Sequence, residues 1–374
     1  MLRSAEAEVQ MPACGAAGGC VLGIESSCDE TAAAVVEGGC RVRSSVVYSQ
    51  VPLHQPYGGV VPEIASRSHI EKIRGIVAQA VEEAFPGEAD PWARIDAIAA
   101  TRGPGLAASL LVGWTAAKGL AMALGKPLLP INHMHAHLWS VFLDHGEVFS
   151  KALYPQLGLA VSGGHTCLAA CSLRADGTLG YALLGQTIDD AAGEAFDKAA
   201  KLLGLGYPGG PVVDRLARAY VPAEGEKPIA FPRGQVSPEH PLPEGLRAEL
   251  CVSFSGLKTS LLTYVQKHPP EGEREVARIV WAYQEAIVDA LARRMDAALR
   301  GGKFRSVALG GGVSLNRRLR EVLEAVAARH RVPLLLAEPK YCGDNAAMIA
   351  GVASRTACSP GDPLALDIDP SLPL

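Results

Sequence analysis

The chain repeats one local pattern at its start and in its middle, and this repetition limits the folds that are open to it. Residues 21–25 are an apolar run that ends in a polar turn, and a second apolar run follows at residues 32–36. Residues 157–161 are again apolar, and a glycine-rich polar loop separates them from an apolar run at residues 167–170. Short apolar runs joined by a turn predict a β-hairpin. Two halves that each open with such a hairpin predict an α/β fold with two duplicated lobes and a cleft between them.

The length of the chain and its apolar spacing agree with this plan. A chain of 374 residues is longer than the roughly 250–300 residues that a single hydrophobic core serves. Between the two hairpins, the spacing of apolar residues after Pro62 predicts one helix. The Ala- and Gly-rich apolar segment 106–123 predicts a second helix, which we expect to pack closely against a sheet.

Net charge and cysteine content indicate the setting in which the chain works. The formal net charge of −4 gives no global sign of a nucleic-acid partner, so any contact with a polyanion has to be a local patch. Nine dispersed cysteines without a Cys-x-x-Cys pair indicate a reducing compartment. Residues 1–20 lack the features of a signal or transit segment, and we find no apolar run long enough to span a membrane. We therefore expect a cytoplasmic protein without a membrane partner.

The segment at residues 132–137 places two imidazoles, those of His133 and His137, four residues apart. On a helix this spacing puts both side chains on one face, where they can bind a single divalent metal ion. The alternative is that one histidine caps a helix and the other faces solvent. A zinc protease would carry a glutamate beside the first histidine as its general base, but Met134 stands there. The pair alone therefore leaves a metal site open beside the structural alternative, and it disfavours a metalloprotease.

A third ligand is available at Asp344, which lies between an apolar strand and an Ala-rich helix at residues 346–352. Asp344 alone could simply cap that helix. Together with His133 and His137 it would complete a set of two imidazoles and one carboxylate. Such a set leaves coordination positions open for substrate or water, and it suits Fe(II) or Zn(II).

Three glycine-rich turns, among them residues 162–166 and 310–312, each follow an apolar strand. Glycine lets the backbone approach a phosphate closely and offer its N–H groups as donors, so these turns favour a nucleotide ligand over plain chain reversal. Asn316 follows the last turn and could bind a ribose or base edge, or could equally cap the next helix. Residues 189–198 predict an acidic helix, and the Pro- and Gly-rich loop at residues 207–211 suits a wall of the ligand site.

These motifs together resemble the tRNA N6-adenosine threonylcarbamoyltransferase family, once described as glycoproteases. The resemblance extends from about residue 21 to residue 352, and the motifs occur in the family order. The matching segments are residues 23–31, 57–67, 133–137, 161–166, 188–210, 253–259, 311–317 and 344–345.

The resemblance implies an actin-like ATPase fold with two ribonuclease H-like lobes and an active site in the cleft between them. We expect the first lobe at residues 20–134 and 345–368, and the second lobe at residues 135–344. Residues 1–19 and 369–374 are expected to be flexible tails, within a Pro-rich C-terminal stretch after Ser359 that should be poorly ordered. The Pro- and charge-rich residues 221–248 predict a surface loop.

The resemblance further implies an acyltransferase that moves a threonylcarbamoyl group from threonylcarbamoyl-adenylate to N6 of an adenosine in tRNA. The acceptor would be the adenosine 3′ to the anticodon in tRNAs that read codons beginning with A, and the product would be N6-threonylcarbamoyladenosine. Implied partners are the tRNA, the adenylate (or ATP or ADP in the cleft), a catalytically silent paralogue and a small P-loop ATPase. A small-molecule kinase on the same fold is one alternative, but it would not need His133 and His137. A non-catalytic scaffold is another, but it should have lost the metal residues.

Carried over position by position, the resemblance assigns one divalent ion per subunit to His133, His137 and Asp344, with Fe(II) first and Zn(II) as the alternative. It also places Asp29 and Glu30 near the reacting centre. The general base stays open among Asp29, Glu30 and Asp197. The residues expected to bind the adenylate are Ala160, Val161, Ser162, Gly163, Gly164, Asp197, Gly210, Asp214 and Asn316.

Three positions depart from the family pattern. His135 stands where bacterial members commonly have glutamate, and on a helix it should point away from His133 and His137. Cys251 stands where aspartate is usual, and Gly343 stands where threonine is usual. These differences concern the surroundings of the site and leave the class of reaction unchanged.

Overall fold

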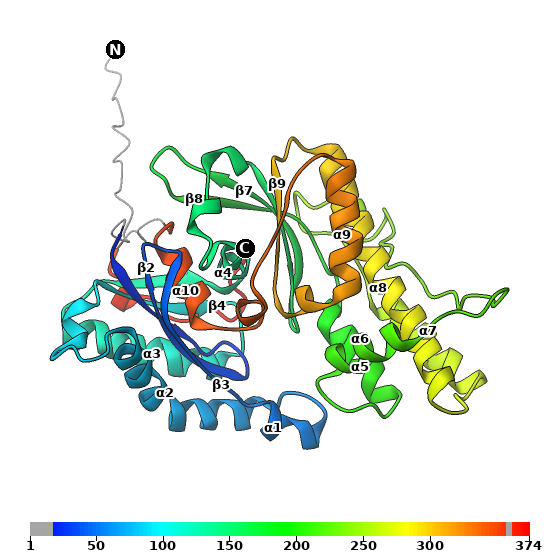
Figure 1. Cartoon of the computed structure of the whole chain (residues 1–374), viewed down its shortest axis with the longest axis horizontal. Helices are drawn as coiled ribbons and strands as arrows, with labels where there is room; N and C mark the ends of the chain where they lie inside the picture. Colours follow the sequence, from blue (N-terminus) through cyan, green and yellow to red (C-terminus); the bar gives the residue numbers. More distant parts are fainter. Residues whose placement is uncertain (1–17, 357–360) are drawn as a thin grey trace, which may run out of the picture.

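The computed structural model describes residues 18–356 and 361–374, which contain two five-stranded sheets (Figure 1). The first sheet has the strand order β3-β2-β1-β4-β5 and the second has the order β10-β9-β6-β7-β8. Residues 1–17, where we expect a flexible tail without targeting features, lie outside the described residues. The strands are β1 (Cys20–Glu25), β2 (Glu30–Glu37), β3 (Arg41–Ser49), β4 (Ala97–Gly103), β5 (Leu128–Asn132), β6 (Gln156–Val161), β7 (Thr166–Leu173), β8 (Leu179–Gln186), β9 (Ser306–Gly310) and β10 (Leu334–Leu336).

The two sheets are built by the same rule. In the first, β1 pairs antiparallel with β2 and parallel with β4. In the second, β6 pairs antiparallel with β7 and parallel with β9. Each sheet therefore grows from an opening hairpin, and the duplicated two-lobed α/β fold predicted from the sequence is confirmed.

Helices cover both faces of the first sheet. The buried residues of β1 and β2 that face α2 and α3 form one apolar core with Val77, Ala80 and Trp114. The opposite face packs against α10, which contacts β1 and β2. The helices of this part are α1 (Val51–His54), α2 (Pro62–Ala84), α3 (Ala107–Leu124), α4 (His133–Trp139) and α10 (Ala346–Ala353).

A second apolar core lies between the two sheets. It contains Val21 and Ala97 from the first sheet and Ala160 and Ala169 from the second. Helices α4 and α10 also contribute side chains to this core and lie between the two sheets (Figure 1). Helix α4 is therefore buried where the two lobes meet, which is the place expected for an active site in an interlobe cleft.

The outer side of the second sheet carries the remaining helices, which share a third core with β6 and β9. Residues 221–247 contain neither helix nor strand, and most of them are exposed, as predicted for a surface loop over residues 221–248. The helices are α5 (Ala192–Leu202), α6 (Gly209–Ala219), α7 (Ser255–Lys267), α8 (Glu273–Gly301) and α9 (Arg317–Arg329). Short 3-10 helices are η1 (Gln55–Tyr57), η2 (Pro91–Arg94), η3 (Ser140–Phe142), η4 (Gly146–Val148), η5 (Lys151–Leu153), η6 (Ala248–Leu250), η7 (Gly312–Leu315), η8 (Pro339–Tyr341) and η9 (Pro363–Ala365).

The C-terminal residues 361–374 follow a defined path, although the sequence predicted a poorly ordered tail. Leu366 and Ile368 pack against the core beneath α3, and the Trp114 indole donates to the Leu366 carbonyl at 3.1 Å. Further along, the Asn132 side chain donates to the Pro373 carbonyl at 2.8 Å. The chain end consequently lies beside α4 (Figure 1).

Helix α3 meets the length and hydropathy expected of a helix that could cross a membrane. The expectation that no run reaches this length is therefore wrong by length and composition. In the fold, α3 packs against β4 and α2, and it buries Leu110, Trp114 and Ala117. An apolar core helix meets the same two criteria, so the finding carries little weight.

A glycine in β1 permits the close packing that positions the segment after Asp344. A Cβ atom at Gly23 would lie 2.8 Å from the Ala350 nitrogen and would overlap the Ala346 carbonyl, both on α10. We expect Gly23→Ala to lower the free energy of unfolding by about 1–3 kcal/mol, as overpacked cores do. Gly75→Ala is the matched control, because Gly75 is exposed within α2 and has open space around it. That change should raise stability by about 0.5–1 kcal/mol. Denaturant unfolding measures both, and equal effects of the two changes would contradict the packing argument.

Candidate metal and nucleotide site

The segment with the two histidines forms a helix because Asn132 caps it. The Asn132 Oδ1 accepts hydrogen bonds from the Met134 nitrogen at 2.9 Å and from the His135 nitrogen at 3.3 Å. Asparagine is among the best N-cap residues, so α4 begins at His133, directly after β5. His133 and His137 then lie one turn apart on the same face.

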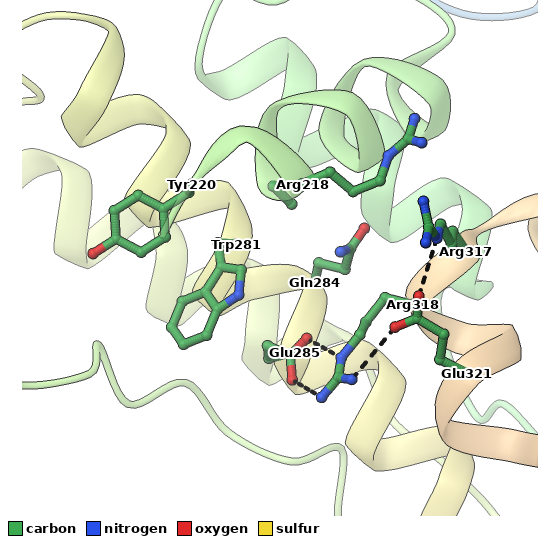
Figure 2. A pocket seen from close by; sticks show the side chains of 9 residues that line it. Arg218, Tyr220, Trp281, Gln284, Glu285, Arg317, Arg318 and Glu321 are labelled. Carbon is green, nitrogen blue, oxygen red and sulfur yellow. Dashed lines mark hydrogen bonds and ion pairs between the residues drawn. The ribbon is translucent and has the colours of Figure 1, made fainter. Parts of the chain in front are cut away.

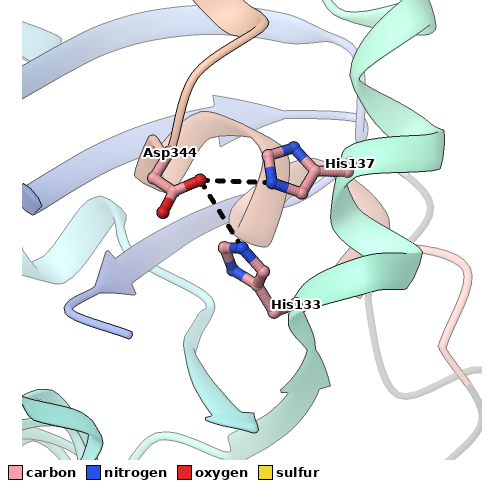
Figure 3. Close-up of side chains that lie close together, drawn as sticks. All are labelled: His133, His137 and Asp344. Atoms are coloured by element: carbon pink, nitrogen blue, oxygen red, sulfur yellow. Dashed lines mark ion pairs between the residues drawn. The ribbon is translucent and has the colours of Figure 1, made fainter. Parts of the chain in front are cut away.

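The side chains of His133, His137 and Asp344 converge on one point (Figure 3). Asp344 Oδ1 lies 3.5 Å from His133 Nε2 and 3.2 Å from His137 Nε2. The three ligand atoms all lie within 4.8 Å of one another. The sequence predicts the histidine pair from its spacing. In the structure, Asp344 joins the pair from a loop more than 200 residues further along the chain. This is the arrangement of two imidazoles and a carboxylate that a divalent ion takes with open coordination positions.

His137 carries the clearest sign that the cluster suits a cation. Its side chain is fully buried, its Nδ1 has no hydrogen-bond partner, and its Nε2 only approaches the Asp344 carboxylate, at 3.2 Å, without forming a well-aligned hydrogen bond. Buried polar atoms in folded proteins are nearly always paired, and an unpaired one calls for a bound group. A metal ion held by Nε2 would satisfy the side that faces Asp344, so the residues present fit such an ion.

Asp344 does not cap the helix that follows it, which was the alternative left open by the sequence. Asn345 takes that position, and its side chain accepts from the Met348 nitrogen at 3.0 Å. Burial raises the pKa of Asp344, but the adjacent His133 and His137 outweigh it and hold the pKa well below its usual range. The carboxylate of Asp344 is therefore anionic, and its Oδ1 faces the two histidines.

Glu25 at the end of β1 orients His133, and it is not among the residues expected from the sequence. Its Oε2 lies 3.0 Å from His133 Nδ1 and accepts from the Thr101 hydroxyl at 2.7 Å. Its Oε1 accepts from the Ser27 nitrogen at 2.5 Å. A carboxylate on Nδ1 fixes the proton there and leaves Nε2 free to bind a metal. A buried glutamate ending an apolar strand was the available signal, since a lone buried charge requires a partner.

The buried carboxylates determine the charge of His133. Burial lowers its pKa, but Asp344 and Glu25 more than compensate and raise it to about 10. Burial likewise raises the pKa of Glu25, and the contact with His133 outweighs this and lowers it. Without an ion, a protonated His133 therefore offsets one of the two negative charges.

His135 points away from the cluster, as its position on the helix predicts. Its ring stacks on Tyr181 of β8 with the centroids 3.7 Å apart. Burial, followed by nearby Arg174, lowers the pKa of His135 to about 3, so this imidazole is neutral. Its contact is thus between α4 and the second sheet.

A buried histidine on α2 supports the loop that carries Asp29 and Glu30. His69 Nε2 donates to the Cys28 carbonyl at 3.0 Å, and its Nδ1 lies 2.8 Å from the Thr31 hydroxyl. Burial lowers the pKa of His69, which keeps the ring neutral and able to donate and accept at once. Both nitrogens of the His69 ring therefore hold this loop, one at Cys28 and the other at Thr31.

The charges show that this loop lies close to the metal cluster. Burial first, then Asp29 and Asp344, raises the pKa of Glu30 well above its usual range. Across the cleft, burial and the charge of Asp29 likewise raise the pKa of Asp197. The charge of Asp29 therefore acts on acidic residues of both expected lobes, Glu30 and Asp197.

The predicted phosphate turn follows β6 and is open toward solvent. Gly163 and Gly164 are exposed, and their positions have no other atom where a Cβ would stand. The Gly193 nitrogen, at the start of α5, donates to the Ser162 carbonyl at 3.2 Å. The backbone of this turn is thus available to a ligand. The expected residues of the segment are, in order, Ala160, Val161, Ser162, Gly163 and Gly164.

His165 in the same turn links it to the metal cluster, and it is not among the residues expected from the sequence. Its ring centroid lies 6.4 Å from that of His133. Burial, then the neighbouring His133 and His137, lowers the pKa of His165 to about 4. A neutral imidazole of this turn therefore lies beside His133.

Helix α5 begins at Ala192, later than the Asp189 predicted from the acidic run. Asp189 Oδ1 accepts from the Phe254 nitrogen at 2.7 Å, and Asp190 pairs with Lys198 at 2.6 Å. These contacts hold the two carboxylates in a turn before the helix, so the acidic helix was predicted too long.

Asp197 and Gly210 meet at the start of α6. Asp197 Oδ1 accepts from the Gly209 nitrogen at 2.7 Å, and the Gly210 nitrogen also bonds this carboxylate. Gly210 has open space at its Cβ position, so a ligand can approach the backbone there. The expected ligand residues of α5 and α6 are therefore adjacent.

Asn316 caps α9, which confirms the structural alternative left open by the sequence. Its Oδ1 accepts from the Leu319 nitrogen at 2.9 Å, and its Nδ2 donates to Gln284 Oε1 at 2.7 Å. One N–H of the amide is left for a ligand, since an asparagine amide carries two. Gln284 on α8 is a further residue that the sequence did not single out.

A cavity of about 410 Å³ opens beside these residues (Figure 2). Asp214 lies next to the lining residue Arg218, whose guanidinium is 3.2 Å from Asp214 Oδ2. The other carboxylate oxygen of Asp214, Oδ1, is buried and has no hydrogen-bond partner. Burial raises the pKa of Asp214. The mixture of aromatic rings and hydrogen-bonding groups suits a nucleobase or ribose. The lining residues are Ala217, Arg218, Tyr220, Trp281, Gln284, Glu285, Arg317, Arg318 and Glu321.

Comparison with known proteins agrees on one family. The model of a family described as tRNA N6-adenosine threonylcarbamoyltransferase matches residues 41–351. A protein of that name from Syntrophobacter fumaroxidans is 47% identical over 356 residues, which cover 93% of this chain and 98% of the relative. Another of that name from Anaeromyxobacter dehalogenans is 49% identical and covers 88% of this chain and 92% of the relative.

Solved structures show the fold. Full-length HypF in its phosphate- and nucleotide-bound form matches 92% of this chain and 47% of its own length, with a TM-score of 0.56 at 13% identity. HypF of T. kodakarensis matches 92% of this chain and 48% of its own length, with a TM-score of 0.55 at 16% identity. The two-lobed arrangement is thus the actin-like ATPase fold, as expected from the sequence.

Proposed function

The chain belongs to the tRNA N6-adenosine threonylcarbamoyltransferase family, and from this premise we propose which of its residues perform the transfer. The enzyme is an acyltransferase that moves a threonylcarbamoyl group from threonylcarbamoyl-adenylate to N6 of the adenosine 3′ to the anticodon. The tRNAs are those that read codons beginning with A, and the product is N6-threonylcarbamoyladenosine. The kinase and metalloprotease alternatives are not favoured, because the relatives share the transferase name over nearly the whole chain.

We propose that His133, His137 and Asp344 hold one divalent ion, Fe(II) or, as the alternative, Zn(II). The observation that carries this proposal is the convergence of three ligand atoms within 4.8 Å, two of them on a helix whose N-cap is fixed. A bound ion supplies Lewis acidity to oxygens of the adenylate. Both ions accept this ligand set, so metal analysis of protein prepared without oxygen distinguishes them.

We propose that the adenylate lies between the turn at residues 162–164 and the cavity beside α6, α8 and α9. Its phosphate would bind the open backbone of Gly163 and Gly164, next to the metal cluster. Asp197 and Asp214 would bind the ribose, and the base would enter the cavity near Asn316. Support comes from the open backbone at Gly163, Gly164 and Gly210 and from the unpaired Oδ1 of Asp214.

Asp29 and Glu30 are proposed to act at the reacting centre. The N6 amine attacks the carbamoyl carbon, the bond to the phosphate oxygen breaks and AMP leaves, so N6 must give up a proton. Asp197 is the weakest candidate for this proton, because its carboxylate already accepts from the backbone of Gly209 and Gly210. Burial, followed by the charges of Asp29 and Asp344, raises the pKa of Glu30 well above its usual range, and this makes its carboxylate a stronger proton acceptor. Asp29 or Glu30 is therefore the proton acceptor in this scheme.

The ribose contact can be tested at Asp214. Asp214→Asn should raise KM for the adenylate about tenfold or more, since a hydrogen bond to a charged group contributes about 1.5–3 kcal/mol. The value of kcat should change little, because Asp214 lies away from the bond that breaks. Asp289→Asn on α8 is the matched control, since this carboxylate pairs with Arg293 outside the cavity. Steady-state kinetics with tRNA and varied adenylate measure the effect, and an unchanged KM would remove Asp214 from the site.

The proposed partners are tRNA, the silent paralogue and the small P-loop ATPase. Exposed apolar side chains on two neighbouring helices support a protein partner: Ile70 on α2 is 65% exposed, and Leu111 and Met122 on α3 are 50% and 69% exposed. Single exposed apolar residues are common on protein surfaces, whereas a group of them indicates an interaction surface. A cytoplasmic location is proposed as well, supported by Cys167, Cys171 and Cys251, which are buried free thiols.

A further inference from the structure

The C-terminal segment runs along the first lobe and ends at the helix that carries both histidines. The Arg102 Nε donates to the Asp367 carbonyl at 2.8 Å, and the Asp369 nitrogen donates to the Arg102 carbonyl at 2.9 Å. The Gly105 nitrogen then donates to the Pro370 carbonyl at 3.2 Å. Residues 367–370 are therefore held along the end of β4 by hydrogen bonds to their own backbone. These bonds do not depend on the side chains of residues 367–370.

The last contact of this segment is made with the N-cap of α4. Asn132 is 8% exposed and uses both ends of its amide. Its Oδ1 accepts from the first amides of α4, and its Nδ2 donates to the Pro373 carbonyl at 2.8 Å. The orientation of the capping oxygen is therefore fixed by the carbonyl of the penultimate residue. Leu374 packs against the interlobe core that contains Met134 of α4.

The same segment also reaches His133 indirectly, through the turn after β4 and Ser27. A Cβ atom at Gly103 would overlap the Asp369 carbonyl, so the tail lies directly against the backbone there. Three residues after Gly103, the Leu106 nitrogen donates to the Ser27 carbonyl at 2.8 Å. The Ser27 hydroxyl in turn lies 3.3 Å from His133 Nδ1. One strap of chain therefore supports the metal helix at its N-cap and, through the turn after β4, the loop beneath His133.

We propose that residues 369–374 form a strap that positions α4, so that His133 and His137 stay at the spacing from Asp344 that a metal ion requires. This inference rests on the metal site proposed above. Its basis is a chain of contacts from Pro373 through Asn132 to the first turn of α4. The strap acts on the reaction only through the two histidines and does not itself touch substrate.

Loss of the strap should weaken metal binding while the lobes stay folded. A chain that ends at Leu372 lacks the Pro373 carbonyl, and its dissociation constant for Zn(II), measured by chelator competition, should rise about tenfold, the lower end of the range for groups that support a ligand. Amide hydrogen exchange at Met134 and His135 in metal-free protein should become faster as well. This second readout does not involve a metal or catalysis.

Asn132→Ser is the second variant, because serine can still cap α4 but is too short to reach Pro373. It adds no charge beside the metal, as aspartate would. If both changes act on the same hydrogen bond, the double variant should bind Zn(II) no more weakly than the worse single one. Ser371→Ala is the matched control within the tail, since Ser371 is exposed, and it should bind as the parent does.

The outcomes separate the strap from the site on which it rests. If the parent chain binds no Zn(II), the proposed metal site is wrong. If the parent binds Zn(II) and the shortened chain binds equally well with unchanged exchange at α4, the strap proposal is overturned and the metal site stands. Additive effects of the two changes would also overturn it, because the tail and Asn132 would then act separately.

Discussion

Replacing Asp344 with alanine should abolish stable metal binding and lower threonylcarbamoyl transfer by about a thousandfold or more, since a Lewis acid contributes several kcal/mol to such a reaction. The variant loses the one anionic atom on which both histidines converge, at 3.2 and 3.5 Å. It should remain folded, because the cap of α10 is provided by Asn345 and not by Asp344. Metal analysis and a transfer assay with tRNA and the adenylate measure the two effects.

His135→Gln is the matched control for Asp344→Ala. It removes an imidazole from the same helix, but one that stacks on Tyr181 and lies outside the cluster. We expect it to keep the metal and most of the activity. Parent protein stripped of metal by a chelator should behave like Asp344→Ala and recover when the ion returns. Full transfer by the stripped protein would exclude a role for the metal in the reaction.

The parts of the fold that depend on local pattern could be predicted from the sequence. The two hairpins follow from alternating apolar runs and turns, and each one starts a sheet with the same pairing rule. The histidine pair also follows from local spacing, since α4 has a capping asparagine directly before it. Asp344 could be named only as a candidate, because a residue before an Ala-rich helix is more often a cap.

The misses are cases in which distant residues decide local structure. The tail is rich in proline, yet its backbone bonds to Arg102, Gly105 and Asn132, and these partners cannot be read from composition. The acidic run at residues 189–198 looked helical throughout, but Asp189 is held by the backbone at Phe254. Glu25 is not predicted as a site residue for a related reason. It ends an otherwise apolar strand, and its partners are His133 from α4 and Thr101 from β4.

Glu25 provides the second large prediction, because it controls which nitrogen of His133 carries the proton. Glu25→Gln conserves volume but places an amide where a carboxylate faced His133 Nδ1. If the Nε2 of the glutamine donates to Nδ1, the proton of the imidazole moves to its own Nε2, and that nitrogen can no longer bind a metal. We expect metal affinity to fall about 10- to 100-fold, the range for loss of a carboxylate that supports a histidine ligand. Transfer at limiting metal should fall with it.

Glu25→Ala separates orientation from stability. It leaves Thr101, the Ser27 nitrogen and protonated His133 without their buried partner, and breaking such a buried charge pair costs about 3–5 kcal/mol. Glu25→Gln should lower the free energy of unfolding less than Glu25→Ala does, yet it should still bind metal weakly. The effect on stability is then separated from the effect on metal affinity. Glu37→Gln at the far end of β2 is the control, since its carboxylate pairs with Arg41 and Arg43 away from the cluster. If Glu25→Gln bound metal as tightly as the parent, the proton on His133 would have to be held by some other group, and the Ser27 hydroxyl at 3.3 Å is the nearest one available.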